Sequence, residues 1–453
     1  MGLVTDLTDR RLTALLAAEQ HTGRLPSLVC AMTRDGSLVW RGSRGDATGD
    51  AQGLAFELQY RIGSITKTMT AVLVLQLRDE RRLSLNDRLS DHLPETDLPG
   101  LTRLTLRNLL SHSSGLTNEP PGEWWERVEG GSFAELVAKL AEAGVPFDAG
   151  TTHHYSNLGY GLLGEVVARV SGRPWWECLT ERLLGPLGMR RTSYDPFDPH
   201  AQGYSVHPYS PLLSVEPATD TGAMAPAGQV WSTVTDLAAY ADFLIAGHRD
   251  VLSPDTLAEM GVPQAGQAGA GLGDGYGLGL RLVPGGSGTL IGHTGSMPGF
   301  QAALFVDRPR RTGVVLLANA IAGLDTVGAP RRLLEELEAW EPDVPRAWAP
   351  VDAVPPEVEE LLGVWHWGNT AKVFTWDGAE LRCVDASTGE REETFRRDDQ
   401  GFVGEAGYHA GERLEVARRA DGSVSHLVCS TFVFTRVPYD PAAPIPGGPP
   451  PSS

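Results

Sequence analysis

Apolar residues recur at helical spacing near the start of the chain and at strand spacing directly after it. Over residues 6–21 Leu7, Leu12, Leu15 and Leu16 recur at helical spacing, which predicts an amphipathic helix. The runs 28–33 and 38–41 are rich in β-forming residues, and Asp35-Gly36 between them is a typical hairpin turn. We therefore expect a helix followed by a β-hairpin.

A second helix is predicted directly after Ser64, and it is apolar on nearly every side. Ile65, Met69 and the run 72–75 leave it no polar face, which is typical of a buried central helix. Further helices are predicted in the middle of the chain, over residues 133–143, 159–170 and 235–245.

Strand character returns after these helices. Residues 289–293, 301–306 and 314–317 are separated by Gly and Pro turns and predict an antiparallel meander, which a helix over 329–340 follows. This order predicts an α/β (α+β) domain over residues 1–340, in which both ends build one antiparallel sheet flanked by helices, with a helical insertion between them.

The composition changes after residue 340. Five prolines between residues 341 and 356 indicate a stiff linker. Short strands with glycine turns about every ten residues follow over 357–437 and predict a small all-β barrel. Residues 438–453 are rich in Pro, Gly and Ser and are expected to be disordered.

Length, charge and cysteine spacing restrict the class of protein. A chain of 453 residues suggests two domains, and a formal net charge of −19 argues against nucleic acid or an anionic membrane as partner. The first residues lack the apolar stretch of a secretory signal, and no run is long enough for a membrane span. Four scattered cysteines indicate free thiols. We therefore expect a cytoplasmic protein.

The chain contains three lysines, and Lys67 stands three residues after Ser64 at the start of the apolar helix. Residues three apart on a helix share a face, so the amine lies within hydrogen-bond reach of the hydroxyl. Burial can lower the pKa of a lysine until it acts as a base, which no arginine can do. An N-cap serine beside a solvated lysine has the same spacing, so this pair alone leaves both interpretations open.

Two further motifs favour chemistry. Tyr155 and Asn157 precede the helix predicted from residue 159, and two residues at this spacing in an extended segment point the same way, into one cleft. His293-Thr294-Gly295 lies on a predicted strand before Ser296, and the glycine would let a substrate approach the backbone closely.

These motifs, in this order, resemble the serine β-lactamase and penicillin-binding protein superfamily, in particular its class C-like branch. The resemblance covers about residues 8–335 and rests on five phrases, which are Arg61–Ala71, Leu109–Leu116, Tyr155–Gly164, Pro226–Thr233 and Gly292–Gly299. It implies that Ser64 attacks an acyl carbonyl, that Lys67 and Tyr155 share the proton transfers, and that Asn157 holds Lys67 and the substrate amide. It also implies an oxyanion hole formed by the backbone N–H groups of Ser64 and Ser296, and no cofactor.

His293 departs from the β-lactamase pattern. Class C enzymes have Lys-Thr-Gly there, with a permanent cation for a substrate carboxylate, whereas histidine is mostly neutral at pH 7. The sequence His293-Thr294-Gly295 resembles instead some D-amino-acid-directed peptidases and esterases of the same branch. We assign His293 to the catalytic set and Thr294 and Gly295 to substrate binding.

Residues 357–437 resemble a lipocalin-like domain found in a subset of these enzymes. The subset includes penicillin-binding-protein-type thioesterases, which release nonribosomal peptides from a carrier-protein thioester and close them head to tail. We therefore expect a serine acyl-enzyme catalyst and rank such a peptide cyclase first, with a peptidyl thioester or ester, free or carrier-bound, as its partner. An esterase or D-amino-acid-directed peptidase is the alternative. A non-catalytic penicillin-binding-like receptor is more remote, because Ser64, Lys67 and Tyr155 are intact.

Two other features have competing interpretations. Arg436 follows the apolar run 432–434 and would either meet a substrate carboxylate or phosphate near the cleft or close the barrel. His153-His154 could suggest a metal, but the sequence contains no second cluster with zinc-type spacing, so we predict no metal site.

Overall fold

The computed structural model describes residues 4–46, 55–140, 142, 144–266, 275–286, 288–344 and 347–438. Two compact units, Met1–Asp343 and Val344–Ser453, divide the chain. Among the described residues, no helix is long and apolar enough to cross a membrane. The predicted disorder of residues 438–453 concerns a tail that lies outside the described residues from 439 onward.

The larger unit is built on an antiparallel sheet to which both of its ends contribute, as predicted. Its described strands run in the order β2 (Ser37–Gly45), β1 (Ser27–Arg34), β12 (Thr312–Ala318), β11 (Phe300–Asp307), β10 (Thr289–Met297), β9 (Arg281–Pro284), β8 (Gly275–Tyr276) and β7 (Ala265–Gly266). The β1–β2 hairpin turns at Asp35 and Gly36, which both have positive φ, of 52° and 75°. This is the conformation expected of a tight hairpin turn.

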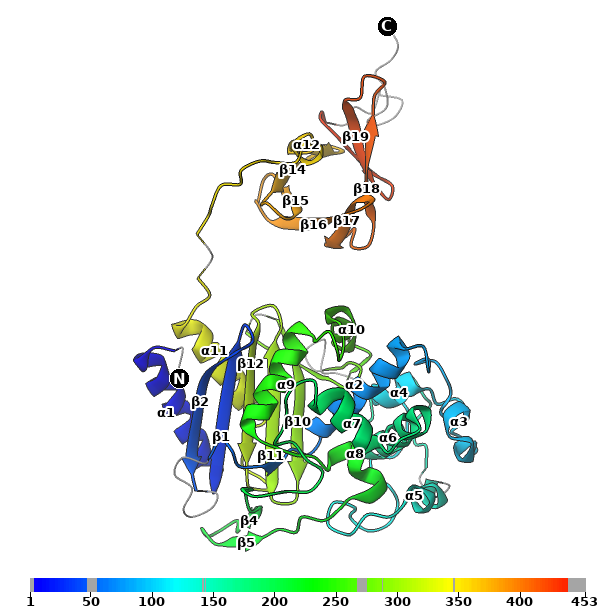
Figure 1. Cartoon of the computed structure of the whole chain (residues 1–453), viewed down its shortest axis with the longest axis vertical. Coiled ribbons are helices and arrows are strands. Elements are labelled where there is room, and N and C mark those ends of the chain that lie inside the picture. The colour runs from blue at the N-terminus through cyan, green and yellow to red at the C-terminus, as the bar shows by residue number, and fades with distance from the viewer. Residues whose placement is uncertain are drawn as a thin grey trace. The chain divides into compact units, whose positions relative to one another are not determined.

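Both faces of this sheet are covered, so its central strands are apolar on both sides (Figure 1). One face carries α1 (Asp6–Gly23) and α11 (Gly328–Trp340), packed against side chains such as Leu316. The opposite face packs against α2 (Ile65–Asp79) and α9 (Val234–Ala246). Alternating residues of one strand therefore belong to two different cores.

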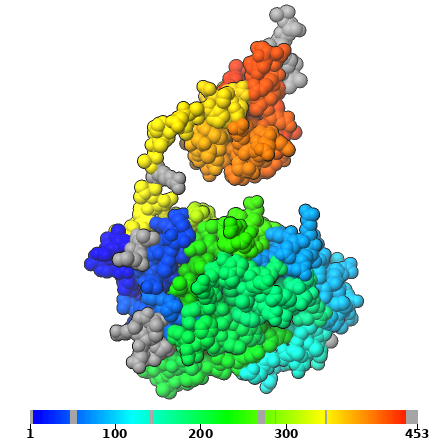
Figure 2. Space-filling model, in the orientation of Figure 1, coloured from blue at the N-terminus to red at the C-terminus, as the bar shows by residue number. Residues whose placement is uncertain are grey.

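A helical segment is inserted between the hairpin and the meander. In the space-filling view it forms much of the visible face of the larger unit, in cyan and green (Figure 2). Besides α2 and α9, its helices are α3 (Leu89–His92), α4 (Leu106–Leu110), α5 (Phe133–Leu140), α6 (Asn157–Ser171), α7 (Trp175–Leu179), α8 (Ala225–Gly228) and α10 (Pro254–Met260). Helix α6 begins at Asn157, two residues before the prediction, because the Ser156 side chain caps it by accepting from the Gly159 N–H.

The smaller unit is a closed antiparallel barrel of eight consecutive strands, which confirms the predicted all-β barrel. The strands are β13 (Gly363–Trp367), β14 (Thr370–Trp376), β15 (Leu381–Asp385), β16 (Arg391–Asp398), β17 (Gly401–Ala406), β18 (Arg413–Arg418), β19 (Val424–Cys429) and β20 (Phe432–Thr435). Helix α12 (Pro356–Glu359) precedes them. Trp365, Phe374 and Phe395 fill part of the interior and are almost completely buried.

Leu316→Ala should destabilise the larger unit by about 2–5 kcal/mol, because it opens a cavity in a core that is closed on all sides. Leu212→Ala is the matched control, since Leu212 is 64% exposed and its replacement should cost less than about 0.5 kcal/mol. Urea unfolding of both variants measures the difference. Equal midpoints would show that Leu316 is not part of a tightly packed core.

Candidate active site

Ser64 stands at the N-terminus of the central helix α2, directly in front of a helix whose residues 65–77 are all buried. Lys67 lies one turn further on, and its Nζ donates to Ser64 Oγ at 2.8 Å and to the Ala227 carbonyl at 2.6 Å. The solvated-lysine alternative is therefore wrong, since Lys67 is 0% exposed.

Burial lowers the pKa of Lys67 to about 7, against the opposing effect of the Glu119 and Glu126 carboxylates. An ammonium group loses its hydration in such a place, whereas the neutral amine does not. A substantial fraction of Lys67 is thus unprotonated at neutral pH. Its lone pair then adjoins the Ser64 hydroxyl, which is the arrangement of a base beside a nucleophile.

Tyr155 lies close to both Ser64 and Lys67, and its ring centroid is 5.1 Å from Lys67 Nζ. Burial raises the pKa of its phenol, and a hydrogen bond with the Ser64 side chain partly offsets this effect. The His112 ring packs against the Tyr155 ring, with centroids 4.1 Å apart. His112 is buried, and its Nδ1 accepts from the Ser156 N–H at 3.0 Å, so this imidazole is a neutral support for the phenol.

Asn157 does not occupy the expected position. Its Nδ2 donates to Glu119 at 2.7 Å, and no hydrogen bond joins Asn157 to Lys67. The Ala227 carbonyl accepts from Lys67 instead. Asn157 is the first residue of α6, so the segment is not extended at this residue, contrary to the prediction from the spacing. Its buried Oδ1 has no hydrogen-bond partner among the described residues.

Glu119 is a site residue that the sequence analysis missed. Its two oxygens accept from Asn157 Nδ2 and, at 2.6 Å, from Trp125 Nε1, and its charge acts on Lys67. Glu119 lies in a loop 38 residues before Asn157, and no local pattern marks it. Only the folded chain brings the two together.

Backbone packing brings Ser296 to the nucleophile. Gly63 has φ of +53°, and a Cβ there would lie 2.5 Å from the Ser296 backbone nitrogen. The N–H groups of Ser64 and Ser296 thus belong to adjacent backbone segments, as an oxyanion hole requires. Gly295 lines the cleft together with Ser64, and packing inside the chain also requires a glycine here, because a Cβ at this residue would meet the Ile62 carbonyl at 2.0 Å.

His293 is fixed as a neutral imidazole. Its Nδ1–H donates to the Thr294 carbonyl at 2.5 Å, which leaves Nε2 to accept from the Tyr276 hydroxyl at 2.8 Å. Burial and the charge of Lys67 lower its pKa to about 3. His293 therefore cannot supply the cation that lysine provides in Lys-Thr-Gly.

A cleft of about 380 Å³ opens in front of Ser64, with Tyr155, Thr294 and Ser296 in its walls. Arg281 also lines it, from the β9 strand that pairs Arg281 with Gly292. Strand β9 covers β10 only over 289–292, so the β10 edge beyond Gly292 has no partner from β9. An exposed strand edge can pair with an extended peptide. Sequence analysis missed Arg281, because only strand pairing places it here.

Arg436 lies in the barrel unit, and its contacts match the structural alternative. Its guanidinium donates to the carbonyls of Glu360, Leu362 and Val364 and stacks 3.8 Å from the Trp365 ring centroid. These bonds hold the segment before β13 against the end of β20, which closes the barrel.

Comparison with known proteins identifies relatives of both units. A model of the family described as beta-lactamase matches residues 12–337, and one described as a domain of unknown function (DUF7586) matches residues 354–436. The D-alanyl-D-alanine-carboxypeptidase/endopeptidase AmpH of Escherichia coli (strain K12) is 32% identical over 192 residues, which cover 39% of this chain and 46% of the relative. The chain spans a little under half the length of the curated relatives that it matches first.

Two solved structures are also similar. SurE, in a structure with D-Leu, is 26% identical with a TM-score of 0.59, and the match covers 96% of this chain and 100% of that chain. A D-amino acid amidase from Ochrobactrum anthropi SV3 is 25% identical with a TM-score of 0.65, covering 74% of this chain and 99% of that chain.

The acylation rate of Ser64 should rise with pH through a midpoint at about 7, because only the neutral Lys67 amine can accept the proton and its fraction grows as pH passes its pKa. Stopped-flow acylation by an activated ester between pH 5 and 9 measures this. Lys67→Arg should lower the rate at least about a thousandfold, since arginine stays protonated. Lys139→Arg, at an exposed lysine, is the control. A rate independent of pH over this range would contradict Lys67 as the base.

Glu119→Gln should move this midpoint to lower pH, because the Glu119 carboxylate raises the pKa of Lys67 and the amide carries no charge. The shift should be on the order of one pH unit or less, the effect of one nearby charge. The same measurement on Glu123→Gln, at an exposed carboxylate of the same loop, should leave the midpoint unchanged. A midpoint that stays fixed or rises in Glu119→Gln would show that Glu119 does not act on Lys67.

Proposed function

This chain belongs to the beta-lactamase family, and on that premise we propose that it is a serine acyl-transfer hydrolase acting on peptide-like donors with a D-residue at the scissile end. The strongest support for this proposal is the pairing of Lys67 with Ser64. Lys67, desolvated and with a pKa near neutrality, is hydrogen-bonded to Ser64 at the mouth of a cleft. A receptor that only binds ligands has no need of such a pair.

The proposed reaction begins with the neutral Lys67 taking the proton of Ser64 Oγ as this oxygen attacks the donor carbonyl. The oxyanion forms beside the backbone N–H groups of Ser64 and Ser296, each of which would stabilise it by about 3–4 kcal/mol. Tyr155, which lines the cleft beside Ser64, gives its proton to the leaving nitrogen, oxygen or sulfur atom and regains a proton from the Lys67 ammonium, so both groups return to their starting states. Collapse leaves an ester on Ser64, which water or an amine then attacks with the same groups acting in reverse.

Peptide-like donors are supported by the walls of the cleft. The β10 edge beyond Gly292 offers backbone partners to an extended chain. The D-configuration is supported by the names of two similar structures, a D-amino acid amidase and SurE with D-Leu. Because His293 is neutral, we assign any anionic group of the substrate to Arg281, which lines the same cleft.

Within this class we propose transfer to an amine, the peptide-cyclising thioesterase reaction, ahead of plain hydrolysis. Its support is the closed barrel of the smaller unit, since a lipocalin-like domain of this kind belongs to the penicillin-binding-protein-type thioesterases that the sequence resembles. The D-amino-acid-directed peptidase or esterase remains the second candidate, supported by the amidase and AmpH.

Mass spectrometry can test both the acyl transfer to Ser64 and the cyclisation. The protein is incubated with a linear peptidyl N-acetylcysteamine thioester that ends in a D-residue. Acyl transfer predicts an acyl adduct on Ser64 that Ser64→Ala lacks, and a donor ending in the L-residue should react at least about tenfold more slowly. Cyclisation predicts a product whose mass equals the donor minus the thiol, whereas linear acid alone would assign the protein to the hydrolases. No adduct with any ester, amide or thioester donor would contradict the proposal as a whole.

A further inference from the structure

The barrel of the smaller unit contains a pocket that the proposed acyl-transfer reaction does not use. It measures about 560 Å³, a volume typical of small-molecule sites. Much of its wall is aromatic, formed by Trp367, Tyr408, Phe432 and Phe434. The Phe432 ring contacts those of Trp367 and Tyr408, with centroids 4.8 Å and 5.4 Å apart, so these rings form one surface.

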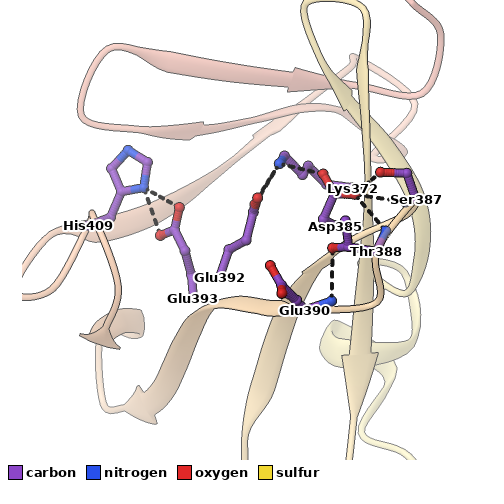
Figure 3. A network of polar contacts seen from close by, with 8 residues as sticks. All are labelled: Lys372, Asp385, Ser387, Thr388, Glu390, Glu392, Glu393 and His409. Atoms are coloured by element: carbon purple, nitrogen blue, oxygen red, sulfur yellow. Dashed lines mark hydrogen bonds and ion pairs between the residues drawn. The ribbon is translucent and has the colours of Figure 1, made fainter. Parts of the chain in front are cut away.

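Charged side chains share this pocket, and carboxylates outnumber cations. Lys372 is paired with Glu392 at 2.6 Å and with Asp385 at 3.3 Å, so its charge is more than matched (Figure 3). Glu393 is 8% exposed. Its ion-pair partner among the described residues is His409, which is charged only when protonated. A buried carboxylate without a permanent cation attracts one.

His409 provides an acceptor with no partner. Both Glu393 oxygens lie within 2.8 Å of its Nδ1, so Nδ1 carries the hydrogen, and Nε2 carries a lone pair whenever the ring is neutral (Figure 3). His409 is 2% exposed and lines the pocket, yet Nε2 has no hydrogen-bond partner among the described residues. A buried acceptor without a hydrogen bond costs free energy, so a ligand that donates a hydrogen bond to Nε2 would be stabilised here.

We propose that this barrel pocket binds an organic cation, namely a primary ammonium group carried on an apolar body. The ammonium donates to His409 Nε2 and neutralises the charge of Glu393, while the aromatic rings stabilise it from the side and enclose the apolar body. All the residues that line this pocket belong to the smaller unit. If it were only structural, the Glu393–His409 pair would brace the strands and the pocket would show no preference for charge.

Calorimetric titration of the full chain with n-hexylammonium, hexan-1-ol and hexanoate tests this proposal. We expect one saturable site for hexylammonium and at least about tenfold weaker binding of the other two, since a charge-assisted hydrogen bond is lost. Equal binding of hexanol would reveal an apolar cavity, stronger binding of hexanoate would reveal an anion site, and no saturable binding would leave a structural pair. Each of these three results would overturn the proposal.

Variants locate the site and separate it from the cleft of the larger unit. Glu393→Gln should weaken hexylammonium binding at least about tenfold, whereas Glu405→Gln, at an exposed carboxylate on β17, should not change it. Trp367→Leu, at a residue that is 44% exposed and so not needed for folding, should weaken it about threefold or more. Unchanged binding in Trp367→Leu and in a folded Glu393→Gln would place the cation elsewhere and refute the assignment.

Discussion

The burial of Lys67 is the constraint on which the rest of the active site depends. Burying an ammonium group in an apolar helix costs free energy, so the pKa of Lys67 falls to about 7. Hydrogen bonds to Ser64 and to the Ala227 carbonyl offset part of the cost of burying the amine. This burial requires α2 to be closed on all sides, by the sheet and by the inserted helices. The packing of helices on both faces of the sheet, which encloses α2, is thus a condition of the chemistry that we propose for Ser64.

Burial also keeps His112 and His293, two histidines near Ser64, in the neutral form at pH 7. His112 and His293 each have one ring nitrogen fixed by a backbone group, and desolvation lowers the pKa of both. Neither competes with Lys67 for the proton of Ser64. They position Tyr155 and Tyr276 instead, and Arg281 supplies a permanent charge on the cleft wall.

Two buried lysines in this chain show how partners decide protonation. Lys67 has neutral oxygens as hydrogen-bond partners, and its pKa falls. Burial alone would also lower the pKa of Lys372, but Glu392 and Asp385 hydrogen-bond to it and raise that pKa. One buried lysine can therefore lose its proton near neutral pH, whereas the other stays charged inside the barrel.

The sequence by itself determined what depends on near neighbours. The spacing of Ser64 and Lys67, the apolar surface of α2, the Asp35-Gly36 turn and the strand repeat of the barrel are properties of short segments, and each segment has the predicted structure. Tertiary structure alone decided what depends on segments far apart in the chain. Folding forms the hydrogen bond between Asn157 and Glu119 and pairs Arg281 with Gly292. It also brings the Ile62 carbonyl so close to Gly295 that no side chain fits there. Strand pairing and loop packing act between residues that carry no mark of one another, so hydrogen bonds and charges across these contacts cannot be seen until the chain has folded.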